Sequence, residues 1–232
     1  MSELLARLSV RRLIVGPAII TFAVTLLRLI GELEHWSPKF FSREAGGAGA
    51  LVGIVWLVPI FGVYFAIRLN QAGHGPASRG RAIGFAVAAL VVEAALSFIV
   101  FKLSLPITTA ILVINLVSFV CLWMAYRGWP ALGKVGLLYG LAARVPVAIL
   151  MLIAMAANWG THYEMGPPGL PQMSLISKWL LIGLLPQLTF WIVFTVIVGS
   201  LFGSLALLFH KGRQPGESAS RGPAARALGA HP

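Results

Sequence analysis

Hydrophobic residues form six long runs along the chain, and most of the charged residues lie in the short stretches between these runs. A helix needs roughly 20 mainly apolar residues to cross about 30 Å of hydrocarbon. Each run reaches this length, so the pattern predicts an all-α integral membrane bundle of about six transmembrane helices. The predicted spans cover about residues 13–31, 50–69, 82–101, 105–125, 135–157 and 176–209.

The last run is longer than one crossing requires, which predicts a tilted helix or one whose first turns lie in the membrane interface. The prolines inside predicted spans include Pro59, Pro146 and Pro186. Because proline removes a backbone hydrogen bond, each one favours a kink. Residues 210–232 follow the last span and are rich in Gly, Pro, Ala, Ser and Arg. They have little apolar surface to bury, so we expect a disordered tail.

Pairs of glycines spaced four residues apart occur at Gly49/Gly53, Gly136/Gly140 and Gly199/Gly203. Such pairs allow two membrane helices to approach closely. They predict close packing of helices within the chain, with dimerisation as the alternative.

The composition supports a membrane protein and excludes several kinds of site. Only 11% of the 232 residues are charged, against about 25% in an average soluble domain. The single cysteine, Cys121, excludes an intramolecular disulfide and a paired-cysteine metal site. All seven acidic residues are Glu, so sites that require Asp, such as an intramembrane aspartyl dyad, are excluded.

The distribution of Lys and Arg predicts the orientation of the bundle. The formal net charge is +11, and the two sides of the membrane receive very different numbers of basic residues. One side has Arg7, Arg11, Arg12, Arg68, Arg79, Arg81, Arg127, Lys134, Lys211, Arg213, Arg221 and Arg226. The other side has Lys39, Arg43, Lys102 and Lys178. The positive-inside rule therefore predicts cytoplasmic N- and C-termini in a cell inner membrane, with the basic residues near lipid head groups and no nucleic-acid partner.

Apart from Arg68 and Lys178 at span ends, three charged residues lie inside predicted spans, where a charge costs roughly 2.5–3.5 kcal/mol on insertion scales. Arg28 lies near the outer end of the first span, one turn before Glu32, so we expect these two side chains to pair. Glu93 and Arg144 lie 12 and ten residues beyond basic residues at the inner ends of their spans. At about 1.5 Å per residue, both lie near the bilayer midplane.

Asn115 and Gln187 lie at a similar depth in two further spans, so four helices place a polar or charged group in one layer. Two interpretations of this layer are open. In the first, Glu93 and Arg144 neutralise each other, and the two amides join helices by hydrogen bonds. In the second, the four side chains line a water-filled cavity that binds a polar solute, an ion or a proton.

The two outer loops contain His35, His162 and Glu164, which are candidate metal ligands because zinc and other divalent metals bind His and Glu. No pair of them has a recognised metal-site spacing, and the alternative is that they are solvated loop residues. The chain contains no His-Glu-x-x-His, Gly-x-Ser-x-Gly or Walker motif, and we expect no cofactor.

These features favour a small transporter or permease-like component with a polar site at the midplane. In this hypothesis Glu93 binds a proton or cation, and Arg144 is its counter-charge or an anion ligand. The alternative is a non-catalytic subunit or scaffold of a larger membrane complex, because short loops and abundant small residues suit packing against a membrane partner or a second copy of the chain. A third hypothesis is a membrane-embedded lipid-modifying enzyme, although one isolated Glu is a poor catalytic constellation.

Overall fold

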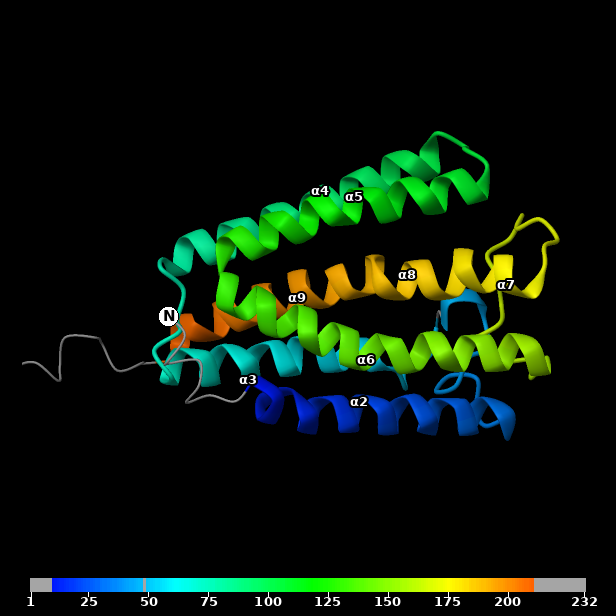
Figure 1. The fold of residues 1–232 in the computed structure, drawn as a ribbon, viewed down its shortest axis with the longest axis horizontal. Helices are drawn as coiled ribbons and strands as arrows, with labels where there is room; N and C mark the ends of the chain where they lie inside the picture. Colours follow the sequence, from blue (N-terminus) through cyan, green and yellow to red (C-terminus); the bar gives the residue numbers. More distant parts are fainter. Residues whose placement is uncertain (1–9, 48, 211–232) are drawn as a thin grey trace, which may run out of the picture.

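The computed structural model describes residues 10–47 and 49–210, which fold as helices joined by short loops. Six helical segments are long and apolar enough to cross a membrane, which confirms the prediction of an all-α bundle of six transmembrane helices. These segments run along the long axis of the molecule (Figure 1). The tail predicted to be disordered lies outside the described residues, apart from His210.

Four of the six spans are single helices, whereas the second and the last are composite. The single helices are α2 (Val10–Leu33), α4 (Arg79–Lys102), α5 (Ile107–Gly128) and α6 (Pro130–Ala157). In the second span, the 3-10 turn η2 (Ile54–Trp56) leads into α3 (Leu57–Gln71), and a further 3-10 turn, η1 (Ala45–Gly47), precedes it in the loop. The last span consists of α7 (Leu175–Lys178), the π-helix η3 (Trp179–Leu184), α8 (Leu185–Leu188) and α9 (Phe190–Phe209).

Two of the spans begin four or five residues away from the starts expected from hydrophobicity, and the other starts differ by three residues or fewer. The second span starts at Ile54 rather than residue 50, because Gly49 has a φ of +78° and Gly53 is extended with a φ of −177°. These two glycines therefore lie in a loop and are not a helix-packing pair. Helix α6 begins at Pro130, five residues before the predicted start. Proline suits the first helical position because the amide hydrogen it lacks would have no partner there.

Helix α9 is the centre of the bundle and packs against α3, α4, α5 and α6, whereas α2 packs mainly against α6. In Figure 1, the α4–α5 hairpin lies on one side of α9, and α3, α6 and α2 lie on the other. Four β-branched residues of α9, at Ile192, Val193, Val196 and Ile197, are almost completely buried. The sequence of α9 is thus apolar around most of its circumference, as expected of a helix surrounded by other helices.

Glycines bring α3 and α9 into backbone contact. A Cβ atom added to Gly62 of α3 would lie 2.5 Å from the Cα of Gly199 in α9. A Cβ added to Gly203 would lie 2.7 Å from the carbonyl oxygen of Gly62. On α6, Gly136 and Gly140 face Val196 and Ile192 of α9. The glycine pairs on α6 and α9 therefore pack within the chain, which is the use of small residues expected in a membrane.

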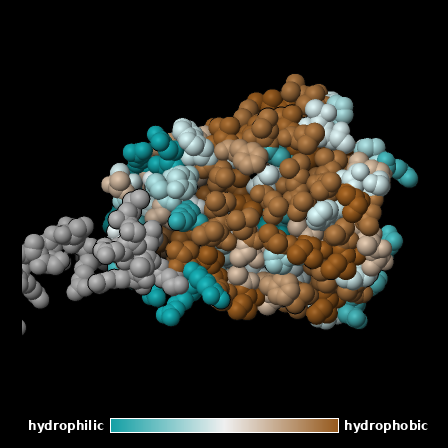
Figure 2. All heavy atoms as spheres, in the orientation of Figure 1, coloured by the Kyte–Doolittle hydropathy of each residue, from teal (hydrophilic) through white to brown (hydrophobic). Residues whose placement is uncertain are grey.

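The outside of the bundle is apolar between two polar ends. Large apolar side chains remain exposed around the helices, including Leu116 at 70% and Phe98 at 63%. Figure 2 shows this broad hydrophobic surface, with hydrophilic residues gathered at both ends of the visible face. Lipid is the solvent that such a surface requires, so the fold is that of a multi-pass membrane protein.

We expect Gly62→Ala to lower the free energy of unfolding by about 1–3 kcal/mol, which is the usual cost of overpacking. The added Cβ atom would overlap the backbone of Gly199 and push α3 away from α9. Thermal unfolding of the purified protein in detergent measures this change. Gly84→Ala in α4 is the matched control, because a Cβ there meets no atom within 4 Å. A midpoint for Gly62→Ala as high as that of Gly84→Ala would contradict the close contact.

Candidate functional site

A cavity of about 430 Å³ lies between α2, α6 and the composite last span. We call the end of the bundle formed by residues 34–53 and 158–174 the loop end, and the opposite end the basic end. The cavity reaches the exposed residues Gly46, Met165 and Pro168 at the loop end. Its polar lining consists of Thr25, Arg28, Arg144, His162, Tyr163 and Gln187. Much of the remaining lining is apolar.

Arg144 of α6 is the most unusual group in this cavity. It is only 4% exposed, and no ion pair in the described part of the chain includes it. Its guanidinium lies over the ring of Trp191 at 4.8 Å and donates a long hydrogen bond of 3.5 Å to Oε1 of Gln187. Its Nε atom is buried without a hydrogen-bond partner. A buried cation is thus held by a ring face and an amide, with no carboxylate to neutralise it.

The irregular last span positions the partners of Arg144. Pro186 has no amide hydrogen for the carbonyl of Ile182, and the π-helix η3 ends two residues before this proline. Gln187 and Trp191 follow at a spacing of four residues, so they lie on the same side of the chain and both face the cavity. Wide π-helical turns occur frequently at functional sites. Gln187 is fixed further by a contact of 3.6 Å from Nε2 to the sulfur of Met151.

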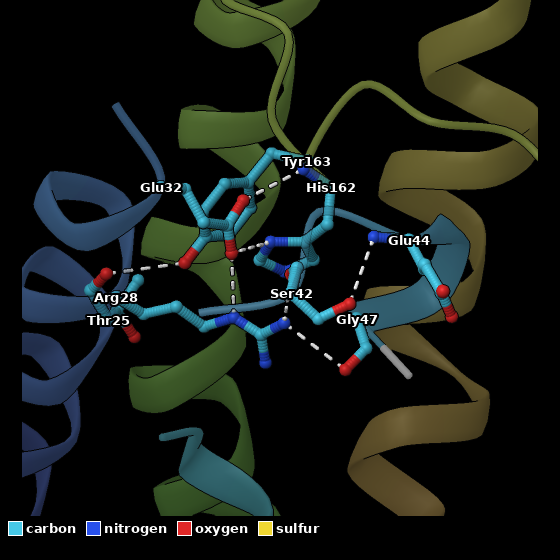
Figure 3. A network of polar contacts seen from close by, with 8 residues as sticks. All are labelled: Thr25, Arg28, Glu32, Ser42, Glu44, Gly47, His162 and Tyr163. Carbon is cyan, nitrogen blue, oxygen red and sulfur yellow. Dashed lines mark hydrogen bonds and ion pairs between the residues drawn. The ribbon is translucent and has the colours of Figure 1, made fainter. Parts of the chain in front are cut away.

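A second polar network holds the loop end of the cavity together (Figure 3). Glu32 at the end of α2 is 1% exposed and accepts hydrogen bonds from Nε of Arg28 at 2.8 Å and from the backbone amide of His162 at 2.9 Å. The ring Nδ1 of His162 lies 2.5 Å from the same carboxylate. Arg28 also donates from Nη2 to the carbonyls of Ser42 and Gly47, each at 3.1 Å. Glu32 therefore joins α2 to the loop of His162, and its partner Arg28 joins α2 to the loop of Ser42 and Gly47.

The environment of the His162 ring, whose Nδ1 lies against the Glu32 carboxylate, favours its neutral form at pH 7. Its pKa lies below the ordinary value because burial outweighs the hydrogen bond to Glu32, and the charge of Arg28 lowers it further. The next residue, Tyr163, donates from its hydroxyl to the carbonyl of Thr25 at 3.2 Å. Burial raises the pKa of Tyr163, while Arg28 and Arg144 both act to lower it. Both guanidiniums are therefore close enough to this hydroxyl to influence it.

The predicted pair between Arg28 and Glu32 is confirmed. The structure divides the four midplane residues into separate groups. Arg144 and Gln187 line the cavity and contact each other. Asn115 does not line it and instead bonds to Thr189 and, from its Nδ2, to the carbonyl of Ile111 at 2.7 Å.

No ion pair between Glu93 and Arg144 occurs in the described part of the chain, so the interpretation in which these two charges neutralise each other gains no support. The hydroxyl of Ser118 donates to Oε1 of Glu93 at 2.8 Å, and Oε2 is buried without a partner. The physical reason is helix placement: α4 packs against α5 and α9, whereas α6 packs mainly against α9 and α2. Helix α9 is the main common neighbour of the helices that carry the two charges.

The three candidate metal ligands make three different contacts. His35 is exposed, and its Nδ1 lies 2.7 Å from the carbonyl of Leu33. His162 binds Glu32, and Glu164 accepts a hydrogen bond from the backbone amide of Gly160. Among residues 10–47 and 49–210, no group of three or more His, Cys, Asp or Glu side chains could hold a metal ion. The metal-site prediction therefore gains no support from the geometry.

Several cavity residues were missed by sequence reasoning. Trp191 had a detectable signal, since it lies four residues after Gln187 on the same helical side of a predicted span. Thr25 and Tyr163 had none, because the contact between them joins residues 138 positions apart.

Fold and cavity together define the class of this chain, which is a multi-pass helical membrane protein with a cavity at one end of its bundle. No family model matches the chain, and neither a curated protein nor a solved structure matches it.

We expect Glu32→Gln to lower the free energy of unfolding by about 3–5 kcal/mol, the usual effect of removing one partner of a buried ion pair. Arg28 would keep its buried charge and lose the carboxylate that balances it. Thermal or denaturant unfolding in detergent measures the loss. Glu34→Gln is the matched control, because Glu34 is exposed two residues further along. Equal stability of the two variants would contradict a structural role for the Glu32 network.

The lowered pKa of His162 predicts a stability that depends on pH. As the pH falls below the unfolded pKa of about 6.5, the unfolded chain binds a proton that the folded chain still excludes. The stabilising contribution is therefore fully present above about pH 6.5 and is lost as the pH falls toward the folded pKa. Unfolding midpoints between pH 7.5 and 5.5 measure it. His162→Asn should weaken the dependence of the unfolding midpoint on pH, whereas His35→Asn, at an exposed position, should leave it unchanged. An unchanged pH dependence in His162→Asn would show that another group causes it.

Proposed function

We propose that this chain is a small transporter or permease-like protein that binds an anion at Arg144. One observation carries the proposal: Arg144 is a cation that is 4% exposed, lines a cavity of about 430 Å³ and has no carboxylate partner in the described part of the chain. Its Nε atom is buried and unpaired. A planar guanidinium with free donors is well suited to bind a carboxylate or a phosphate.

The depth of Arg144 supports a role in moving a solute rather than in holding the fold. Arg144 lies ten residues beyond Lys134 in α6, which places it about 15 Å from the basic end of the bundle. A charge at this depth costs roughly 2.5–3.5 kcal/mol on insertion scales and marks a substrate pathway by default. Because the cavity extends from Arg144 to the loop end, a solute from that side would reach the middle of the membrane.

The irregular segment beside the cavity supports a protein that changes shape. Alternating access requires one part of a bundle to move against another while the binding site stays in place. Segments α7, η3 and α8 contain a π-helix and a break at Thr189, whose φ and ψ are −113° and −84°. Non-helical backbone at membrane depth is tolerated where it lines a cavity. We assign the movement to this segment and the fixed part to α9, which contacts four other helices.

The excess of Lys and Arg on one side supports an inner-membrane location with both termini in the cytoplasm. In this orientation the basic end faces the cytoplasm, and the cavity opens outward.

We expect Arg144→Met to abolish anion-driven currents while raising the unfolding midpoint, because it removes both the anion ligand and an unneutralised buried charge. Purified protein in proteoliposomes on a solid-supported membrane would be challenged with chloride, acetate, octanoate and methyl phosphate. Arg127→Met is the matched control, because Arg127 also lies over a tryptophan ring, at 5.4 Å, but is exposed.

Two outcomes would contradict this function. Currents of wild-type size in Arg144→Met would remove Arg144 from the pathway. No current from the wild-type protein with any of these anions, together with a stoichiometric second protein in the intact complex extracted from native membranes, would support a non-catalytic subunit instead.

A further inference from the structure

We propose that the ligand of this cavity is an amphipathic anion, in which one negatively charged group pairs with Arg144 and an apolar body lies along the cavity wall. This inference rests on the proposed function, since it names the class of substrate for the same site. Three features of the cavity support it: the net charge around it, the chemistry of its wall, and its opening at the loop end.

The balance of charges selects a ligand with one negative charge. Arg28 and Arg144 both line the cavity, and Glu32 neutralises Arg28. His162 is neutral, as described above, so one positive charge remains, and it lies on Arg144. A single carboxylate or phosphate-ester charge balances it, whereas a second negative charge would be buried without a partner. A cation or a neutral solute would leave Arg144 unneutralised.

The wall of the cavity requires an apolar body on the ligand. Five of the side chains around it are Val24, Val147, Met151, Ile182 and Trp191, and they come from four different elements. A hydrated inorganic anion would leave these surfaces in contact with water. A volume of about 430 Å³ lies within the range of about 300–1,000 Å³ that is usual for pockets that hold drug-sized molecules.

The opening at the loop end gives such a ligand a route into the cavity. Met165 is 46% exposed and lines the cavity mouth together with Pro167 and Pro168. These apolar residues would lie where the bundle meets the lipid head groups, which is where amphipathic molecules concentrate. The ligand could be supplied as a free amphiphile or as an anionic bilayer lipid, and both have the chemistry that the site requires.

The test uses bromine as a contact quencher of tryptophan fluorescence, because Trp191 lies directly beside Arg144. The full chain would be placed in nanodiscs of phosphatidylcholine and titrated with 2-bromododecanoate, whose bromine is next to the carboxylate. The signal of Trp191 would be obtained by subtracting that of Trp191→Phe. We expect saturable quenching, stronger than with 12-bromododecanoate, and an affinity weakened about tenfold or more in Arg144→Met but unchanged in Arg127→Met. Arg144→Lys should weaken binding less than Arg144→Met, because it keeps the charge.

Competition identifies the ligand class and its source. Dodecanoate should displace the probe, whereas dodecanol, which lacks the charge, and acetate, which lacks the apolar body, should not. Loss of quenching in nanodiscs that contain phosphatidylglycerol would assign the site to a bilayer lipid. Quenching that persists there would assign it to a free amphiphile.

The results that overturn this inference differ from those that overturn the proposed function. Quenching that does not saturate, or that is equal in Arg144→Met and wild type, would refute the amphipathic ligand. Displacement by acetate as strong as that by dodecanoate would refute it too, while leaving an anion transporter in place. Saturable, Arg144-dependent quenching without any current would retain the ligand class and refute transport.

Discussion

Hydrocarbon solvates neither a charge nor an unpaired backbone amide, and this constraint governs how the whole chain is arranged. It requires continuous helices and moves most charged side chains to the two ends of the bundle. Arg28, Glu93 and Arg144 are charged side chains that nevertheless lie buried within the helices, and each has different polar contacts. Arg28 is neutralised by Glu32, and Glu93 accepts one bond from Ser118. Arg144 has a ring face and an amide and, like Glu93, no oppositely charged partner in the described part of the chain.

Stability and the candidate site occupy different halves of the bundle. Toward the basic end, large side chains such as Phe65, Leu69 and Trp129 form a continuous buried cluster, and the glycines of α3 and α9 are in backbone contact. Toward the loop end, the same bundle encloses the cavity, whose wall includes Val147 and Met151 of a second buried cluster and whose loops are joined by the network of Arg28 and Glu32. A ligand that enters the cavity would therefore meet the half of the bundle that contains an open space, which is where binding regions are commonly found.

Local features of this chain could be predicted from the sequence, whereas contacts between distant residues could not. The length of the apolar runs determined the six helices, and the spacing of four residues determined the pair of Arg28 and Glu32. Hydrophobicity could not detect the loop at Gly49 and Gly53, because glycine is compatible with either state. The contact of His162 with Glu32 spans 130 positions and depends on which helices are neighbours. The same information was missing for Glu93 and Arg144, whose similar predicted depth suggested a pair that is absent from the ion pairs of the described residues.

The separation of Glu93 from Arg144 changes what the midplane layer can do. If they were adjacent, the two charges would cancel and the polar groups would serve only to join helices. Helix α9 packs against α4, which carries Glu93, and also against α6, which carries Arg144. Each of the two charges therefore has its own set of neighbours. Glu32 is the carboxylate that pairs with the cavity-lining residues Arg28 and His162, and both of its oxygens already accept hydrogen bonds. Among the described residues, Arg144 is therefore the charged group that lines the cavity without a carboxylate partner, and this is the charge that the proposed anion would neutralise.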